Sequence, residues 1–286
     1  MAMNPKLLRP RSTVHPEAAA WATRVVANGG SVSGTTLTAV SRFCASIAAA
    51  GIRDRFYRLN LFCGTADASL IAVRTPLYRG QSLGGTQFGN TLDTNINFAI
   101  TDYAETGASG GLDGDGSSKY LNTGLTYDAM GTPATMHLAA FKSSGTWTQQ
   151  TELIGARDSD DLYQIQLRYP SSQHKISAHA GGSAHFINDV SVSTDTSFLV
   201  LSRNSSTSLV LYENASSIGS NATSTTPGGA NHNILVFNRN AIGTPQFALW
   251  PHRLMGYSIG LGMTATQVAA YNSAMQAFQT ALSRNV

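Results

Sequence analysis

The feature that most constrains the fold is a period-two alternation in the second half of the chain. In its clearest case, Tyr163, Ile165 and Leu167 alternate with Gln164 and Gln166. Successive side chains of a strand point to opposite faces of a sheet. The alternation therefore predicts a half-buried strand with an apolar inner face and an outer face in water.

Further apolar runs of strand length follow at short intervals. They lie at residues 136–140, 175–180, 198–202, 209–212, 234–237 and 254–259. Turn signals such as Gly181-Gly182 and Pro227-Gly228-Gly229 separate several of them. Many short strands with turns between them predict an all-β sandwich or jelly roll.

The two ends of the chain show helical spacing instead. Pro16 opens a predicted helix that ends at Asn28-Gly29-Gly30, and a second predicted helix spans about 35–50. Near the C-terminus, Thr264 and Gln267 form a capping box ahead of an apolar stripe. Because each helix must cover such a stripe, we expect the C-terminal helix to pack on the N-terminal helices.

Residues 74–110 are rich in Gly, Thr and Asn and have weak periodicity. A stretch of this length without obvious elements is typically functional or lies over a neighbour. We therefore expect residues 1–15 and much of 74–110 to become ordered against a neighbouring subunit. We place a domain boundary near residue 100. Residues 1–100 are then an arm, a helical region and an extended connector, and residues 101–286 are the β domain with its C-terminal helix.

Composition excludes several classes of partner. The net charge is +3 with 12% charged residues, and no basic run is dense enough for a nucleic-acid footprint. No apolar run approaches the ~18 residues of a membrane span, so we expect no membrane insertion. The first residues, MAMNPKLLRPR, lack the apolar segment of a signal peptide, so none is expected.

The chain has two cysteines, Cys44 and Cys63, which are too few for a disulfide framework. We favour two separate buried thiols. A Cys44–Cys63 bridge is the alternative, if the predicted second helix packs back on the run that ends at Cys63.

Five segments resemble, in order, the laminin-G-like, concanavalin-type jelly roll. They are GDGSSKYL (114–121), MHLAAFKSSG (136–145), ELIGARDSDDLYQIQL (152–167), FLVLSRNSSTSLVLYENAS (198–216) and LMGYSIGLGMTATQVAAY (254–271). The sequence departs from the family at Asn214-Ala215, where Asn-Gly is usual. The resemblance implies a mainly β fold. This would be a concanavalin-like antiparallel β-sandwich (jelly roll) with N-terminal helices and a C-terminal helix, serving binding or scaffolding.

The chain also resembles tailed-bacteriophage proteins. The resemblance lies in AWATRVVANGGSVSGTTLTAVSRFCASIAAAGI (20–52), the following FYRLNLFCG, and the ending ALSRNV. It implies a non-enzymatic virion structural protein, a head decoration or tail appendage, assembled in the host cytoplasm. Its implied partners are other virion proteins, further copies of itself and a cell-surface glycan. A soluble glycan-binding lectin is the alternative function, and a glycan hydrolase is a third.

The chemistry of catalysis is missing from the sequence. Concanavalin-fold glucanases carry paired carboxylates in an E-x-D-x-x-E strand, and this pattern does not occur. There is no P-loop and no dinucleotide fingerprint, so we expect no cofactor and no catalytic residues. Asp158, Asp160 and Asp161 could supply oxygens to Ca²⁺. A polar hairpin turn is the favoured interpretation, so no metal site is expected.

If the domain is an adhesin, loops at the rim of the sandwich are the expected contact surface, because strands supply the frame and loops the contacts. The candidate glycan-binding residues are Trp147, Arg157, Asp158 and Asp160. The Trp147 ring could stack on a sugar, and the charged groups could hydrogen-bond its hydroxyls.

Overall fold

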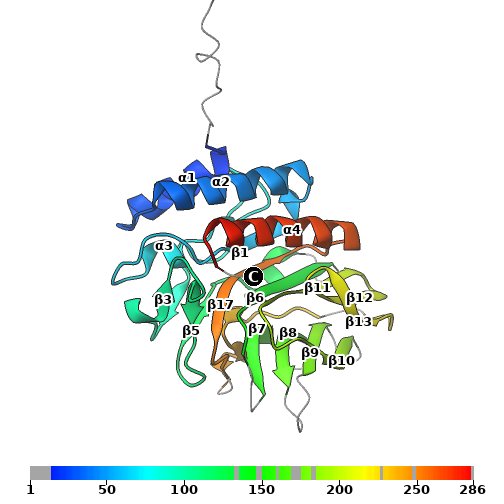
Figure 1. The fold of residues 1–286 in the computed structure, drawn as a ribbon. Coiled ribbons are helices and arrows are strands. Elements are labelled where there is room, and N and C mark those ends of the chain that lie inside the picture. The colour runs from blue at the N-terminus through cyan, green and yellow to red at the C-terminus, as the bar shows by residue number, and fades with distance from the viewer. Residues whose placement is uncertain are drawn as a thin grey trace, which may run out of the picture.

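Two stacked β-sheets and a layer of helices make up the protein, as a computed structural model shows (Figure 1). The structure describes residues 14–131, 135–145, 150–158, 161–168, 175–181, 185–225, 228–246 and 249–284. The strands are nearly all antiparallel, and helices from both ends of the chain cover one sheet. This confirms the predicted fold class, a mainly β antiparallel sandwich with terminal helices.

Sheet A lies beneath the helices in Figure 1. Its strands, in spatial order, are β13 (Ser216–Asn221), β12 (Ser208–Glu213), β11 (Ser197–Ser205), β6 (Met136–Lys142), β17 (Arg253–Gly260), β4 (Gly111–Asp113) and β3 (Tyr103–Ala104). A further strand, β1 (Phe56–Asn60), pairs with β17 through the register Phe56↔Gly260 to Asn60↔Tyr257. The long strand β17 thus has β6 on one edge and both β1 and β4 on the other.

Sheet B forms the opposite layer. Its strands, in spatial order, are β10 (Phe186–Ser191), β9 (Lys175–Gly181), β8 (Leu162–Arg168), β7 (Thr151–Arg157), β14 (Leu235–Val236), β5 (Tyr120–Asn122) and β2 (Thr94–Ile96). A small hairpin of β15 (Arg239–Ala241) and β16 (Thr244–Pro245) joins the same sheet, and β15 runs parallel to β7. Strand β15 follows β14 directly and so brings residues 238–246 alongside the end of β7.

The helix layer consists of α1 (Pro16–Ala27), α2 (Gly34–Ala49) and α4 (Ala265–Ala281), with a short α3 (Ile71–Arg74). The capping box at the start of α4 is present, because Thr264 Oγ1 accepts from the Gln267 amide and Gln267 Oε1 from the Thr264 amide. Phe278 of α4 meets Phe43 of α2 edge-on at 6.0 Å. The expected packing of the C-terminal helix on the N-terminal helices is therefore confirmed for α2, against which α1 packs in turn.

Strands β6 and β11 separate two hydrophobic cores. Leu138 and Leu199 point into the core between the sheets, whereas Phe141 and Phe198 point into a second core beneath the helices. Both strands are apolar on both faces, as expected of strands covered on each side. The ring of Trp250, which precedes β17, is fully buried in the inter-sheet core and is structural.

The segment 74–110 packs against its own chain. Asp93 forms an ion pair with Arg58 at 2.6 Å, and both side chains are fully buried. The Tyr257 hydroxyl donates to the same carboxylate at 2.8 Å. The expectation that much of 74–110 orders against a neighbouring subunit is therefore wrong for this part, because an intramolecular ion pair holds it. Residues 1–13 of the arm lie outside the described residues.

Residues before position 100 contribute to both sheets, through β1 in sheet A and β2 in sheet B. The division into units 1–100 and 101–286 stays a prediction. Cys44 and Cys63 are buried free thiols, which confirms the favoured interpretation over a bridge. Among the described residues, no helix is both long and apolar enough to cross a membrane.

Candidate functional site

The loop site predicted from the sequence is described in part. Trp147 and Asp160 lie outside the described residues. Arg157 ends β7, and the Asp158 amide donates to the Asp161 carbonyl at 3.0 Å, which closes a turn before β8. Arg157 also pairs with Ala241 of the β15–β16 hairpin. Two of the four residues are thus placed beside this hairpin.

An open pocket of about 270 Å³ lies at the hairpin, between it and the residues that lead into β5. We call it the hairpin pocket. Its lining consists of Ser117, Ser118, Tyr120, Asn238, Thr244, Pro245, Gln246 and Leu249. None of these side chains is charged, and Arg157 and Asp158 are not among them.

The apolar walls come from three elements. Tyr120 opens β5 and packs against the inter-sheet core, so its ring is anchored from behind. Pro245 belongs to β16, and Leu249 forms an isolated parallel bridge with Glu152 of β7. A ring and two aliphatic groups on rigid elements offer an apolar surface of fixed shape.

The serine wall is held by one carboxylate. Asp115 accepts from the amides of Ser117 at 2.9 Å, Ser118 at 2.8 Å and Lys119 at 3.0 Å. The Ser118 hydroxyl also donates to Asp115, at 2.6 Å. The Gly-Asp-Gly-Ser-Ser stretch is therefore an ordered turn that fixes both serines at the pocket. The carboxylate of Asp115 is thus used to hold the turn together.

The inner wall carries amide groups. Asn238 is fully buried, and its Oδ1 accepts from the Arg239 amide at 2.7 Å. Within the described ranges, its Nδ2 has no hydrogen-bond partner. Gln246 Oε1 accepts from Arg239 Nη2 at 3.3 Å. A buried donor without a partner is costly, and burial also keeps this Nδ2 out of reach of a ligand in the pocket.

Behind Gln246 lies a buried polar network on the outer face of sheet B. Gln164 accepts from Arg239 Nη1, Gln166 donates to Glu152, and the Arg239–Glu152 pair is 3.5 Å apart. Gln164 and Gln166 are only 1% and 4% exposed. The prediction of a wet outer face for this strand is therefore wrong, because partners on neighbouring strands cover and hydrogen-bond both amides.

Glu152 is the titratable centre of this network. Burial raises the pKa of its carboxyl to about 7, against the opposing effects of Arg239 and Gln166. In the part of the chain that is described, the charged group acting on it is Arg239. Two-carboxylate glycoside hydrolysis needs a second acid roughly 5–10 Å away. The network lacks the electrostatic signature of such a pair.

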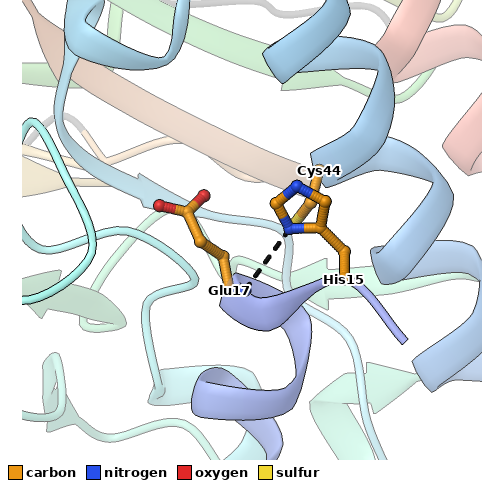
Figure 2. A group of neighbouring side chains, drawn as sticks. All are labelled: His15, Glu17 and Cys44. Carbon is orange, nitrogen blue, oxygen red and sulfur yellow. Dashed lines mark hydrogen bonds between the residues drawn. The ribbon is translucent and has the colours of Figure 1, made fainter. Parts of the chain in front are cut away.

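A second group of candidate ligands lies at the start of α1. Donor atoms of His15, Glu17 and Cys44 come within 4.8 Å of one another (Figure 2). The His15 Nδ1 accepts from the Glu17 amide at 3.3 Å and so caps the helix. Both Glu17 oxygens accept from Arg53 Nε, at 2.6 and 2.8 Å.

The chemistry of this group does not fit a metal ion. Burial raises the pKa of the Cys44 thiol to about 12, so a metal ion would have to displace a firmly held proton from a buried group. The Glu17 carboxylate is engaged by a guanidinium, which would repel a cation. The three residues are a helix cap, an ion pair and a buried thiol.

Comparisons with known proteins place the fold. Neither the protein-family models nor the curated proteins give a match to this chain. Among solved structures, a mutant of Trypanosoma rangeli sialidase that displays trans-sialidase activity is similar, with a TM-score of 0.52 and 8% identity. The alignment covers 85% of this chain and 39% of the sialidase, so this chain spans about two fifths of that protein.

Two shorter structures are also similar. Domain 4 of AbnA, an extracellular arabinanase from Geobacillus stearothermophilus in complex with arabinotriose, has a TM-score of 0.41 and 16% identity over 64% of this chain and 85% of its own. The Ruminococcus gnavus sialidase CBM40 bound to α2,3-sialyllactose has a TM-score of 0.40 and 9% identity. The alignment covers 56% of this chain and 95% of the CBM40 chain. The likeness to the sialidase shows the fold alone, a sandwich of two antiparallel β-sheets.

The hairpin pocket was not found by sequence reasoning, although part of its signal was present. Ser117, Ser118 and Tyr120 lie inside the segment 114–121 that carries the resemblance to laminin-G-like domains. The other wall, 238–249, has no strand periodicity in the sequence. Only the fold brings the two segments together.

Proposed function

We propose that the chain is a non-enzymatic, lectin-like module that binds a neutral glycan in the hairpin pocket. The observation that carries this proposal is the lining of the pocket, an anchored tyrosine ring and aliphatic walls beside amides and hydroxyls. A sugar presents the complementary pattern, because its ring has an apolar face and its hydroxyls donate and accept hydrogen bonds.

We infer a neutral ligand because, among the residues that the structure describes, no charged side chain lines the pocket. An acidic sugar would bring a carboxylate into a site without a cation to pair it, at a cost in desolvation. Gln246 and Ser117, which also line the pocket, would instead hydrogen-bond the hydroxyls of a neutral sugar.

The non-enzymatic part of the proposal rests on the lone Glu152. Its side chain is 2% exposed, and Glu152 is not among the residues that line the pocket. Its charged neighbour is Arg239, and within the described ranges no second acid acts on it as hydrolysis would require.

The setting we propose is a bacteriophage virion, as a head decoration or tail appendage in several copies. The support is the resemblance of residues 20–52 to tailed-phage proteins. Weak pockets repeated on one particle gain avidity without new contacts, which suits a shallow neutral site. A soluble lectin that uses the same pocket is the alternative, and it differs only in the absence of a particle.

We propose further that Arg157 and Asp158, with Trp147 and Asp160, contact additional units of the same glycan. Arg157 pairs with Ala241, three residues before Thr244 of the pocket. Alanine at Arg157 should weaken binding of an oligosaccharide and leave a monosaccharide unaffected. If the variant lost affinity equally for both ligands, or kept its affinity for both, this extension would be wrong.

The test of the pocket is a glycan array followed by titration of the best ligand. Tyr120→Ala and Gln246→Ala should each raise the dissociation constant at least about tenfold, since truncation of a central contact commonly costs 1–2 kcal/mol or more. Tyr120→Phe keeps the ring and should bind within about threefold of the native chain.

Phe186→Ala is the matched control, because Phe186 is a partly exposed ring at the far edge of the same sheet. It should leave binding unchanged. If Tyr120→Ala and Gln246→Ala bind as well as the native chain, or if no neutral glycan binds it, the proposal is wrong. Release of free sugar during incubation would instead favour the hydrolase.

The particle setting is tested separately. Antibodies raised against the chain should label intact phage particles in micrographs and co-sediment with them. Glycan binding together with unlabelled particles would leave the soluble lectin as the function.

A further inference from the structure

A second pocket, of about 280 Å³, lies between α1 and the loop 77–87, distant in sequence from the hairpin pocket. Its walls include Glu17 and Arg24 of α1, Arg53 and Arg79. Ser82, Gln87, Leu77 and Leu83 also line it. We call it the arginine pocket. It differs from the hairpin pocket in being strongly charged.

One of its three guanidinium groups is neutralised. Arg53 donates from Nε to both oxygens of Glu17, and its Nη1 donates to the Gly80 carbonyl at 2.8 Å. The Arg53 group also lies 3.7 Å from the centre of the Tyr78 ring. The Glu17 carboxylate pairs with Arg53 at 2.6 Å and points away from the His15 ring in Figure 2.

The other two guanidinium groups have only neutral partners among the described residues. Arg24 Nη2 donates to the carbonyls of Pro76 and Leu77, at 3.0 and 2.9 Å. Arg79 Nη2 donates to the Gly89 carbonyl at 2.9 Å. Within the described ranges, the Nε of Arg24 and the Nε of Arg79 are buried without any acceptor. The pocket therefore carries an excess of two positive charges.

These charges repel one another. Burial lowers the pKa of Arg24, and Arg79 and Arg53 lower it further, while Glu17 opposes them. Burial is also the main cause that lowers the pKa of Arg79. An anion in the pocket would relieve both the desolvation and the repulsion.

We propose that the arginine pocket binds a doubly charged oxyanion, the phosphate group of a small phosphate ester. A dianion balances the two uncompensated charges, and its oxygens can pair with the guanidinium groups of Arg24 and Arg79 that line the pocket. The Ser82 hydroxyl lies in the same wall as a further donor. Leu83 is 52% exposed and offers an apolar contact to the organic part of the ester. This site is independent of the glycan proposal.

The probe for the test is inorganic phosphate, titrated into the full chain by calorimetry at constant ionic strength. The native chain should bind one phosphate saturably, and phosphate should raise its melting temperature. Arg24→Gln and Arg79→Gln should each weaken binding at least about tenfold, since a hydrogen bond to a charged group contributes roughly 1.5–3 kcal/mol. Each variant also loses hydrogen bonds to backbone carbonyls, so its own melting temperature without phosphate is the baseline for its phosphate-dependent shift.

Arg24→Lys and Arg79→Lys keep the positive charge but lack the planar, two-pronged donor geometry of a guanidinium group. They provide folded variants if a glutamine variant fails to fold. They should weaken phosphate binding as well. Arg42→Gln, an exposed arginine on α2 outside the pocket, is the control and should bind phosphate normally.

Three results would overturn the proposal. The first is no saturable phosphate binding by the native chain. The second is equal phosphate binding by the native chain and by the Arg24 and Arg79 variants. The third is tighter binding of succinate than of phosphate at matched ionic strength, which would assign the pocket to dicarboxylates.

Discussion

The outward faces of the two sheets are both buried, but by opposite chemistry. The outer face of sheet A carries Phe141, Phe198 and Val200, and α2 and α4 cover it with hydrocarbon. The outer face of sheet B carries Gln164 and Gln166, covered by a hydrogen-bonded network. Apolar burial is non-directional and tolerates approximate partners, whereas a buried polar network needs every partner in place.

The two faces therefore have different roles, one in stabilising the sandwich and the other in positioning a binding site. The face beneath the helices stabilises the sandwich through apolar contacts. The face of sheet B holds the hairpin in a fixed position through Arg239, which contacts both the network and Gln246 of the hairpin pocket. The polar face is thus the one that can position a binding site, at the cost of a carboxyl group with a strongly raised pKa.

The largest expected effect concerns the helix layer. Phe278 is 2% exposed and packs against Phe43. Phe278→Ala should lower the free energy of unfolding by about 3–5 kcal/mol, because a fully buried ring leaves a cavity. Urea denaturation measures this. Val26→Ala, at a position that is 63% exposed on α1, is the control and should change it by less than about 0.5 kcal/mol.

A loss below about 1 kcal/mol for Phe278→Ala would mean that the helices unfold separately from the sandwich. The apolar face would then be a docking surface, and the contrast between the two faces would weaken.

The second prediction concerns pH and the helix-covered face. His137 is fully buried, with Nδ1 2.8 Å from the Leu261 carbonyl and Nε2 2.8 Å from the Ser258 hydroxyl. Burial lowers the pKa of its ring to about 4 from 6.5. The unfolded chain therefore binds more protons between these values. The stability contributed by the neutral ring is complete above pH 6.5 and is lost as pH falls through 4.

The expected loss is about 2–4 kcal/mol, at 1.36 kcal/mol for each pKa unit. The measurement is the free energy of unfolding of the native chain and of His137→Gln between pH 4 and 7. The free energy of unfolding of the glutamine variant should lack this part of the pH dependence. Parallel curves for the two proteins would show that His137 titrates normally.

The third prediction has the opposite sign and concerns sheet B. The pKa of Glu152 is raised to about 7 from 4.5, mainly by burial. The folded chain therefore binds more protons in this window. Stability from this group is complete below pH 4.5 and is lost as pH rises through 7, by about 1–3 kcal/mol after allowance for the opposing Arg239.

Glu152→Gln should remove this loss, so that the variant gains stability relative to the native chain as pH rises from 5 to 8. Chemical denaturation at three pH values in this range measures the difference. If the native chain gains stability relative to the variant instead, the Arg239–Glu152 pair outweighs burial, and the network is an ordinary ion pair.

Local patterns predicted most of the elements, because capping and periodicity act within a few residues. The Thr264–Gln267 box located the start of α4 to the residue, and the alternation at 163–167 located β8. Alternation shows which residues share a face, but not what covers that face. Gln164 therefore looked solvent-exposed, since its partner Arg239 lies 75 residues further along the chain.

The candidate site was harder to predict for the same reason. Arg157 and Asp158 were chosen because they lie in a polar loop, and the structure places them beside the hairpin but not in its pocket. The pocket itself joins residues 117–120 to residues 238–249. Hairpin β15–β16 has strands of three and two residues, too short to leave a periodic signal.

The smallest expected effect is a gain in stability at the edge of sheet A. Asn214 and Ala215 link β12 to β13 with φ of +49° and +67°, the left-handed pattern of a type I′ hairpin turn. Glycine is the residue that this turn favours at the second position, and it is where the sequence departs from the laminin-G-like pattern. A left-handed backbone conformation costs alanine roughly 1–2 kcal/mol. The greater conformational freedom of glycine in the unfolded chain reduces the expected gain in stability by about 0.4–1 kcal/mol.

Ala215→Gly should therefore stabilise the protein by about 0.5 kcal/mol, measured by urea denaturation as a shift in midpoint without a change in slope. The same substitution at Ala269, an exposed position inside α4, should destabilise by about 1 kcal/mol, since glycine is a poor helix residue. Opposite signs for one substitution at two positions would isolate the backbone contribution. A loss at Ala215 would show instead that its methyl group, which packs against the helix-covered core, outweighs the strain of the turn. The edge of sheet A would then depend on the same apolar packing as its centre.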